Sequence, residues 1–201
     1  MPHIAMRDAG ESDAAALAEI AVIAAHGILT LMYGSLVPGK SVAETFVERR
    51  ILNPKDVSAL RHWRIAEDAA HRILGGLNSF PFNVDAYEGI DPEIGADRLA
   101  PLAGLAELEA LATDMYFVNM IAVFPEHRRS GAGQALMAEA HRLARESGFT
   151  QVGLCTFEAD AALAAFYGKL GYVVRERRPI RPHPAIEYSG NWVLMVHELA
   201  T

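Results

Sequence analysis

A short glycine-containing stretch in the second half of the chain has the composition of an anion-binding loop. It reads Arg128-Arg129-Ser130-Gly131-Ala132-Gly133 and leads into Gln134 to Ser147, an alanine- and leucine-rich run with helical spacing. The two glycines lack a Cβ, so the backbone can turn sharply and approach a ligand closely. The first N–H groups of a helix are unpaired and carry partial positive charge, and the arginines add charged donors. The stretch therefore predicts a site for a phosphate or pyrophosphate.

A buried strand is expected directly before this loop. Residues 115–123 are nearly all apolar or β-prone, and a turn follows at Phe124-Pro125-Glu126-His127. Two familiar phosphate-binding motifs do not fit. A dinucleotide fingerprint needs a third glycine where this chain has Leu136, and a P-loop needs Gly-Lys-Ser/Thr where Gly133 is followed by Gln134. Because an isolated G-x-G also occurs in ordinary turns, the glycines alone do not identify the ligand.

A second stretch, residues 160–172, offers a group that can give up a proton. It begins with Asp160, contains Phe166-Tyr167 in an expected helix, and ends with Gly171-Tyr172. A phenol with an unperturbed pKa near ~10 stays protonated at neutral pH and can donate to a leaving group. The alternative is that Tyr167 only packs beside Phe166.

Together the two stretches resemble the acetyl-coenzyme A signature of the GNAT superfamily of N-acetyltransferases. That family has a strand ending in Ala-Val, then Pro-Glu, then Arg-x-x-Gly-x-Gly opening a helix, followed later by Asn, Phe-Tyr and Gly-Phe/Tyr. The matching residues here are Ala122-Val123, Pro125-Glu126, Arg128 to Gly133, Phe166-Tyr167 and Gly171-Tyr172.

The resemblance implies an α/β fold, with a twisted mixed sheet of about six to seven strands flanked by helices. It also implies transfer of an acetyl group from acetyl-coenzyme A to a primary amine, by direct attack in a ternary complex. Tyr167 would be the catalytic residue, as general acid for the leaving thiolate. The implied contacts to coenzyme A are the strand backbone for the pantetheine arm and the loop for the pyrophosphate, together Ile121, Ala122, Val123, Arg128, Arg129, Ser130, Gly131, Ala132, Gly133, Gln134, Asp160 and Tyr167.

The chain departs from the family pattern at Asp160, where asparagine is usual. An ionised aspartate can accept a hydrogen bond from a pantetheine amide but cannot donate one. Asp160 therefore either keeps an altered ligand contact or serves only as a helix cap. Two other functions stay open beside acetyl transfer: a non-catalytic module that binds or senses acyl-coenzyme A, and the same fold using a longer acyl donor.

The acceptor site is less well defined. Asn119 on the expected strand cannot act as a base but could orient the acceptor, and Tyr33 lies in a segment that often lines the acceptor site in the family, with core packing as its alternative. A water chain to bulk could replace a protein base. The candidate bases, none with a reason in the sequence to prefer it, are Glu67, Asp85, Glu109, Asp114, His183 and Glu187.

Composition limits the remaining possibilities. The 201 residues suit a single domain, 1–201, and the net charge of −7 argues against nucleic-acid binding. We expect a cytoplasmic protein, because there is one cysteine, no apolar run long enough to span a membrane and no signal peptide. Cys155 reads as a small buried hydrophobe, and no metal is expected because the histidines are scattered. The partner is a small-molecule amine or a protein amino group, and any self-association is expected to give a homodimer.

The other elements follow from periodicity and capping residues. Residues 81–113 look like an insertion before the cofactor-binding strand, and we expect part of the acceptor specificity to lie there. The segment 29–39 is broken by glycine and proline, and a basic connection is expected over 177–184. The expected strands are 3–7, 61–66, 71–80, 151–157, 172–175 and 192–199, and the expected helices are 14–25, 42–52, 101–112 and 161–170.

Overall fold

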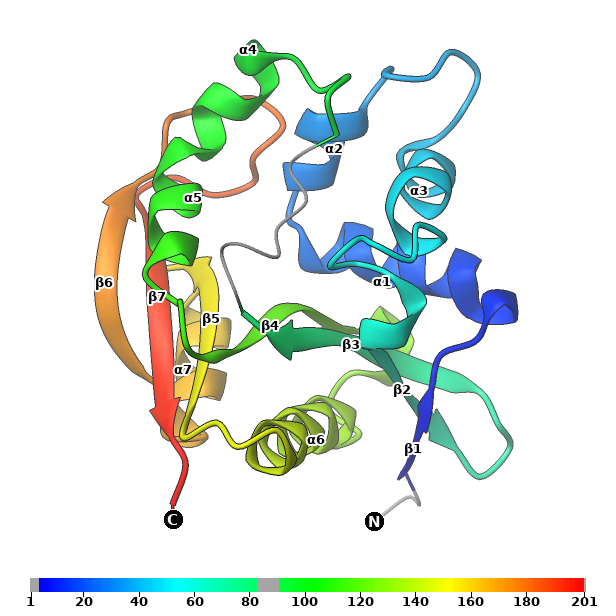
Figure 1. The fold of residues 1–201 in the computed structure, drawn as a ribbon, viewed down its shortest axis with the longest axis vertical. Coiled ribbons are helices and arrows are strands. Elements are labelled where there is room, and N and C mark those ends of the chain that lie inside the picture. Colours follow the sequence, from blue (N-terminus) through cyan, green and yellow to red (C-terminus); the bar gives the residue numbers. More distant parts are fainter. Residues whose placement is uncertain (1–3, 83–90, 201) are drawn as a thin grey trace.

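The computed structural model describes residues 4–82 and 91–200, and a seven-stranded sheet forms its centre (Figure 1). Neighbouring strands are antiparallel except for β4 and β5, which are parallel and joined by a helical crossover. This confirms the expected mixed α/β sheet. In spatial order the strands are β1 (Ile4–Asp8), β2 (Trp63–Asp68), β3 (Ile73–Pro81), β4 (Tyr116–Val123), β5 (Gln151–Phe157), β7 (Asn191–Glu198) and β6 (Val173–Pro179).

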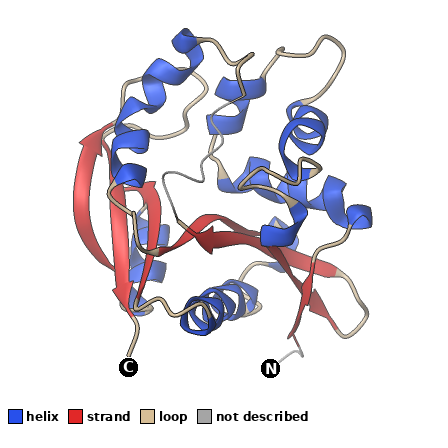
Figure 2. Ribbon diagram, in the orientation of Figure 1, coloured by secondary structure: helices blue, strands red, loops and turns tan. Residues whose placement is uncertain are grey.

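Helices cover both faces of the sheet (Figures 1 and 2). One face carries α6 (Ala132–Glu146) and α7 (Ala161–Lys169). The other face carries five helices, which pack with the sheet around a separate apolar core. These are α1 (Ala14–Ala24), α2 (Ile28–Tyr33), α3 (Val42–Phe46), α4 (Ala96–Leu99) and α5 (Ala103–Ala110).

The spacing of apolar residues explains how α6 and α1 pack on the two faces of the sheet. In α6 the buried side chains Leu136, Met137, Ala140 and Ala144 recur every three or four residues, so one stripe of the helix faces the sheet. In α1, Leu17, Ile20 and Ala21 form a comparable stripe on the opposite face. Each face of the sheet is therefore covered by a helix whose apolar stripe packs against it.

A glycine pair brings β3 and β4 close together. A Cβ on Gly75 would lie 2.4 Å from the carbonyl oxygen of Ala122, and one on Gly76 would lie 3.3 Å from Ile20. Glycine is therefore required at the first position and favoured at the second, as expected for a close backbone approach.

The strands β4 and β5 separate partway along their length, and this separation creates the site. They pair at three positions only, ending at Val118 and Leu154. Beyond that point β4 continues to pair with β3, and β5 continues to pair with β7. Residues 119–123 therefore present a strand edge without a partner on the β5 side.

Some boundaries differ from those expected. A short helix, α2, forms in the segment left unassigned, and α3 passes into a single π-helical turn, Val47–Ile51, in place of one regular helix. The helical segment expected from residue 101 begins earlier, at Ala96. Strand β6 runs to Pro179, so residues 177–179 are not part of a connection: they pair with β7, and a proline is tolerated at the end of this edge strand.

Candidate active site

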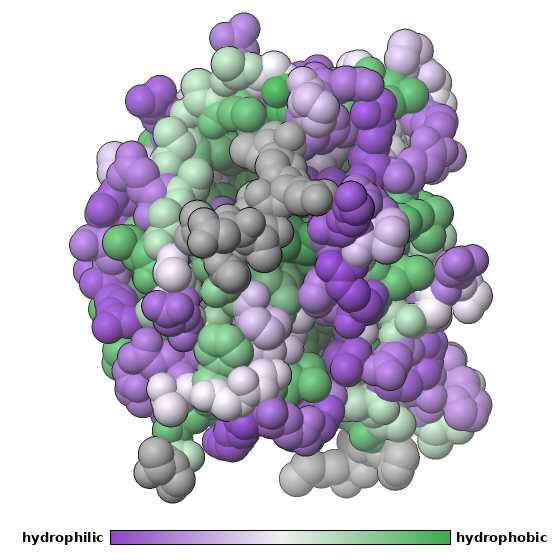
Figure 3. Space-filling view, viewed as in Figure 1, coloured by the Kyte–Doolittle hydropathy of each residue, from purple (hydrophilic) through white to green (hydrophobic). Residues whose placement is uncertain are grey.

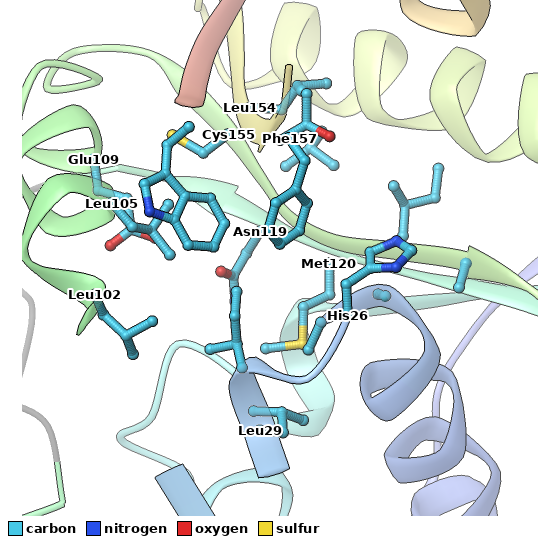
Figure 4. Close-up of a pocket in the computed structure, with 18 of the residues that line it drawn as sticks. His26, Leu29, Leu102, Leu105, Glu109, Asn119, Met120, Leu154, Cys155 and Phe157 are labelled. Carbon is cyan, nitrogen blue, oxygen red and sulfur yellow. The ribbon is translucent and has the colours of Figure 1, made fainter. Parts of the chain in front are cut away.

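A cavity of about 860 Å³ lies where β4 and β5 separate. Its floor is the open edge of β4, residues 119–123, and the facing part of β5, residues 154–157. Its walls come from α1 and α2 on one side and from α4 and α5 on the other, as the close-up in Figure 4 shows for several residues. In the surface view of Figure 3, hydrophobic residues gather along the α4–α5 side and hydrophilic residues lie at the outer margins.

The glycine loop forms the N-terminus of α6 beside this cavity. Gly131 has φ +95° and is the N-cap residue, and Arg129 also has a positive φ of 63°. The amide of Ala132 donates to Ser130 Oγ at 3.3 Å. Within the described chain the amides of Gly133 and Gln134 have no acceptor, while that of Ala135 already bonds to Gly131. The loop therefore presents free N–H groups at a helix N-terminus.

Tyr167 reaches the cavity from α7, and only 5% of it is exposed. Burial raises the pKa of its phenol well above the usual value, and the nearby charge of Asp160 adds to the rise. The ring also packs against Phe166, with ring centres 5.2 Å apart. Tyr167 thus lines the cavity as a protonated phenol and packs beside Phe166 as well.

Asp160 caps α7 at the edge of the cavity. Its carboxylate accepts the amide N–H of Leu163 at 2.9 Å and the hydroxyl of Tyr188 at 2.6 Å. Although burial opposes ionisation, the bonds from Tyr188 and the helix amides hold the pKa of Asp160 below its usual value. The same bond raises the pKa of Tyr188 to about 12. The cap is present, and both carboxylate oxygens are engaged.

Asn119 marks a bulge at the point where β4 leaves β5. The register between β3 and β4 shifts here, so Asn119 has no partner across the pair. Its Nδ2 donates to Asn78 Oδ1 at 2.8 Å, and Asn78 in turn donates to the carbonyl of Val57 at 3.0 Å. This chain of bonds leaves Asn119 Oδ1 as an acceptor on a side chain that lines the cavity (Figure 4).

Tyr33, a candidate for the acceptor site, lies in the apolar core. It is 1% exposed, its hydroxyl accepts a bond from Arg50 Nη1 at 3.0 Å, and its ring packs against Phe46. Tyr33 is not among the residues that line the cavity, whereas its neighbour Met32 is. Core packing, the alternative considered from the sequence, describes its surroundings.

Among the candidate bases, the structure brings only Glu109 to the cavity wall, within the residues that it describes. Glu67 is paired with Arg7 and His71, and Glu187 is paired with His26. Asp85 falls outside the described residues. Burial raises the pKa of Glu109 to about 7, and the charge of Arg50 partly opposes this rise.

A signal for Glu109 was present in the sequence. Leu102, Leu105, Ala106 and Glu109 fall at positions i, i+3, i+4 and i+7, and all line the cavity. Such spacing puts them on one face of a helix. A single carboxylate on this apolar stripe is what distinguishes Glu109 from Glu107, which is exposed and paired with Arg178.

The described part of the chain has neither a cluster of metal-ligand side chains nor a helix suited to a membrane. Over residues 4–82 and 91–200, no three His, Cys, Asp or Glu side chains are grouped so that they could hold a metal ion. No helix in the same ranges is long and apolar enough to cross a membrane.

Solved structures with the same fold include several described as acetyltransferases or N-acetyltransferases. One described as an acetyltransferase is 15% identical, with a TM-score of 0.67 over 98% of this chain and 100% of that chain. An agmatine N-acetyltransferase is 18% identical, with a TM-score of 0.62 over 98% and 99%. A PaiA N-acetyltransferase from Thermoplasma acidophilum, in complex with coenzyme A, is 13% identical, with a TM-score of 0.55 over 98% and 99%. At these identities the likeness shows the fold alone.

Sequence comparison shows the family. No curated protein sequence matches the chain significantly. A family model described as the acetyltransferase (GNAT) family matches residues 55–172, more than half of the chain, and this range includes β4, the glycine loop, α6, β5 and α7. The chain therefore belongs to the GNAT family of acetyltransferases.

Proposed function

We propose that this acetyltransferase moves an acetyl group from acetyl-coenzyme A to a primary amine, with both substrates bound together. The observation that carries the proposal is the separation of β4 from β5, with the free amides of the loop at one end and Tyr167 beside it. An extended amide-bearing arm can pair with an open strand edge as an added strand would. The free amides and arginines suit a pyrophosphate.

In this proposal the chain holds coenzyme A along β4. The backbone of Ile121, Ala122 and Val123 binds the pantetheine arm, and the segment from Arg128 to Gln134 binds the pyrophosphate. When bound, acetyl-coenzyme A supplies an activated thioester. The five residues from Val123 to Asn119 are separated by four steps of about 3.3 Å, so they span roughly 13 Å. The arm thus leads from the loop toward Asn119, where the two strands meet.

Tyr167 is the proton donor to the departing sulfur. Its raised pKa keeps the phenol protonated at neutral pH, and a protonated phenol can donate to a developing thiolate. Direct attack by the amine needs no enzyme nucleophile. The raised pKa of Cys155, which is caused by burial and by the charge of Glu109, supports the same conclusion, because a protonated thiol is a poor nucleophile.

Replacing Tyr167 with Phe tests this role. We expect Tyr167→Phe to lower kcat for thiol release by about 10²-fold or more while acetyl-coenzyme A still raises the melting temperature. Tyr172→Phe is the matched control: Tyr172 is also buried, but it bonds to His141 and does not line the cavity. Equal turnover by Tyr167→Phe and the control would remove the assigned role.

The same assay separates the other functions considered for the fold. Stabilisation by acetyl-coenzyme A without thiol release for any amine would indicate a binding or sensing module. Faster thiol release from a longer acyl thioester than from acetyl-coenzyme A would indicate that the same site uses a longer acyl donor.

A further inference from the structure

Helix α5 presents one carboxylate to an otherwise apolar wall of the cavity. On this side the lining residues include Leu99, Leu102, Leu105 and Ala106, and Glu109 continues their stripe. Figure 4 shows Glu109 near Leu105 on one side of the cavity, with His26 on the other. Glu109 also interacts electrostatically with Cys155, which directly follows the last β5 residue paired with β4. Glu109 therefore lies close to the point where the strands separate.

Asp160 and Glu109, the carboxylates that line the cavity, differ in their hydrogen bonds. Asp160 accepts hydrogen bonds on both oxygens, from Leu163 and Tyr188. Glu109 makes no hydrogen bond or ion pair with its side chain among the described residues. The guanidinium of Arg50, whose charge acts on Glu109, is directed at Tyr33 and Asp56. The Glu109 carboxylate is therefore available to a ligand in the cavity, and a cation is the partner that its charge favours.

The rest of the cavity lining is also mainly apolar. Leu29, Met32 and Phe46 line the cavity from α2 and α3, and Phe157 and Trp192 line it from β5 and β7. Trp192 is 1% exposed, and its indole N–H has no acceptor in the described ranges. The ring packs against Phe157 and lies beside Gly104 of α5, so it adds to the apolar surface near Glu109.

We propose that Glu109 binds the ammonium group of the acceptor and removes its proton, and that the acceptor is a primary amine with an apolar body. The inference rests on the proposed acetyl transfer and names the base and the substrate class for that site. The carboxylate matches the charge of an ammonium group, and the leucine, methionine and aromatic side chains favour a hydrocarbon or aromatic substituent.

The proposed acetyl transfer uses Glu109 as proton acceptor and Tyr167 as proton donor. Glu109 takes one proton from R–NH3⁺, which frees the electron pair on nitrogen. A C–N bond forms to the acetyl carbonyl carbon, the C–S bond breaks, and its electron pair remains on sulfur. The nitrogen releases a second proton as the amide forms, while the sulfur gains one through Tyr167, which is then reprotonated. The proton on Glu109 passes to water, so the products are an amide, a thiol and one released proton.

The titration of Glu109 suits this role. A general base works best with a pKa near the working pH, and burial brings that of Glu109 to about 7. The charge that acts on it is that of Arg50, from the π-helical turn after α3, and the charge of Glu109 in turn raises the pKa of the Cys155 thiol on β5. We expect kcat/KM to rise up to about pH 7 as Glu109 ionises, and then to level off.

Glu109→Gln tests the proposal, with Glu107→Gln as a matched control on the same helix. We expect Glu109→Gln to lower kcat/KM by about 10²- to 10⁴-fold and to remove the rise below about pH 7, with binding of acetyl-coenzyme A unchanged. Calorimetric titration with 2-phenylethylamine, without any acyl donor, should also give weaker binding to this variant. Glu107→Gln should match the wild type in all three measurements, because Glu107 is exposed.

An acceptor screen tests the substrate class. We expect 2-phenylethylamine and n-hexylamine to be acetylated at least about tenfold more efficiently than spermidine or agmatine. Wild-type activity that survives in Glu109→Gln with its pH profile intact would overturn the role of Glu109, while leaving acetyl transfer in place. A preference for the polycations would overturn the substrate class. If the wild type releases no thiol with any amine, the proposed function itself fails.

Discussion

Replacing the partly buried carboxylate of Glu109 should stabilise the protein, and by an amount that depends on pH. In the folded chain the pKa of Glu109 is raised from 4.5 to about 7. Between these pH values the native state binds more protons than the unfolded state, so wild-type stability falls as the pH rises. Above about pH 7 the loss is complete. Glutamine has nearly the same shape and does not titrate, so Glu109→Gln avoids this loss.

The size of the stability difference follows from the same shift in the pKa of Glu109. At about 1.4 kcal/mol per pKa unit, the rise from 4.5 to about 7 corresponds to up to about 3 kcal/mol. We expect Glu109→Gln and the wild type to differ little near pH 4.5, apart from the change of side chain. Above about pH 7.5 the variant should be more stable by as much as about 3 kcal/mol.

Urea denaturation at pH 5, 6, 7 and 8 measures this difference. Glu19→Gln on α1 is the control, because Glu19 is exposed and makes no ion pair within the described ranges; its effect should be small and constant with pH. If the stability difference between Glu109→Gln and the wild type does not grow with pH, Glu109 is not desolvated as the structure indicates, and the argument for its role as a base loses its electrostatic support.

Three further predictions concern the loop, the cap and the bulge. Gly133→Ala should fold normally, because its Cβ would lie 3.5 Å from Phe166, yet bind coenzyme A more weakly, whereas Gly131→Ala at φ +95° should lose about 1 kcal/mol of stability in thermal unfolding. Asp160→Ala should cost about 1 kcal/mol through the lost cap and Asp160→Asn much less; equal costs in denaturant titration would contradict the cap. Asn78→Ala should cost about 1–3 kcal/mol, because the amide of Asn119 loses its partner, and unchanged stability would count against this bond.

The parts of the site that were predictable from sequence rest on local signals. The strand, the glycine loop and the start of α6 follow one another within 31 residues, Tyr116 to Glu146, and each is marked by its own residues: an apolar run, Gly131 and the buried stripe of α6. Asp160 likewise caps a helix, as its type and position indicate. Such features depend on backbone preferences that act over a few residues.

The parts that were missed depend on contacts between distant segments. The separation of β4 from β5 begins at the bulge around Asn119, and beyond it the two strands are held by different partners, β3 and β7. Glu109, one of the candidate bases in the sequence, is distinguished from the others only when α5 packs over β5 and places it near Cys155. Tyr33 was ambiguous because an amphipathic ring suits a core or a pocket, and Arg50, 17 residues later, determines its place.

The most direct test of the account is thiol release from acetyl-coenzyme A by the wild-type protein and Tyr167→Phe, with 2-phenylethylamine as acceptor and mass spectrometry of the product. We predict stoichiometric thiol and N-acetylated amine from the wild type, and a rate at least about 10²-fold lower from the variant. The account would be contradicted if the protein is stabilised by acetyl-coenzyme A but yields no acetylated product with this or any other amine, because the separated strands would then hold the thioester without transferring its acetyl group.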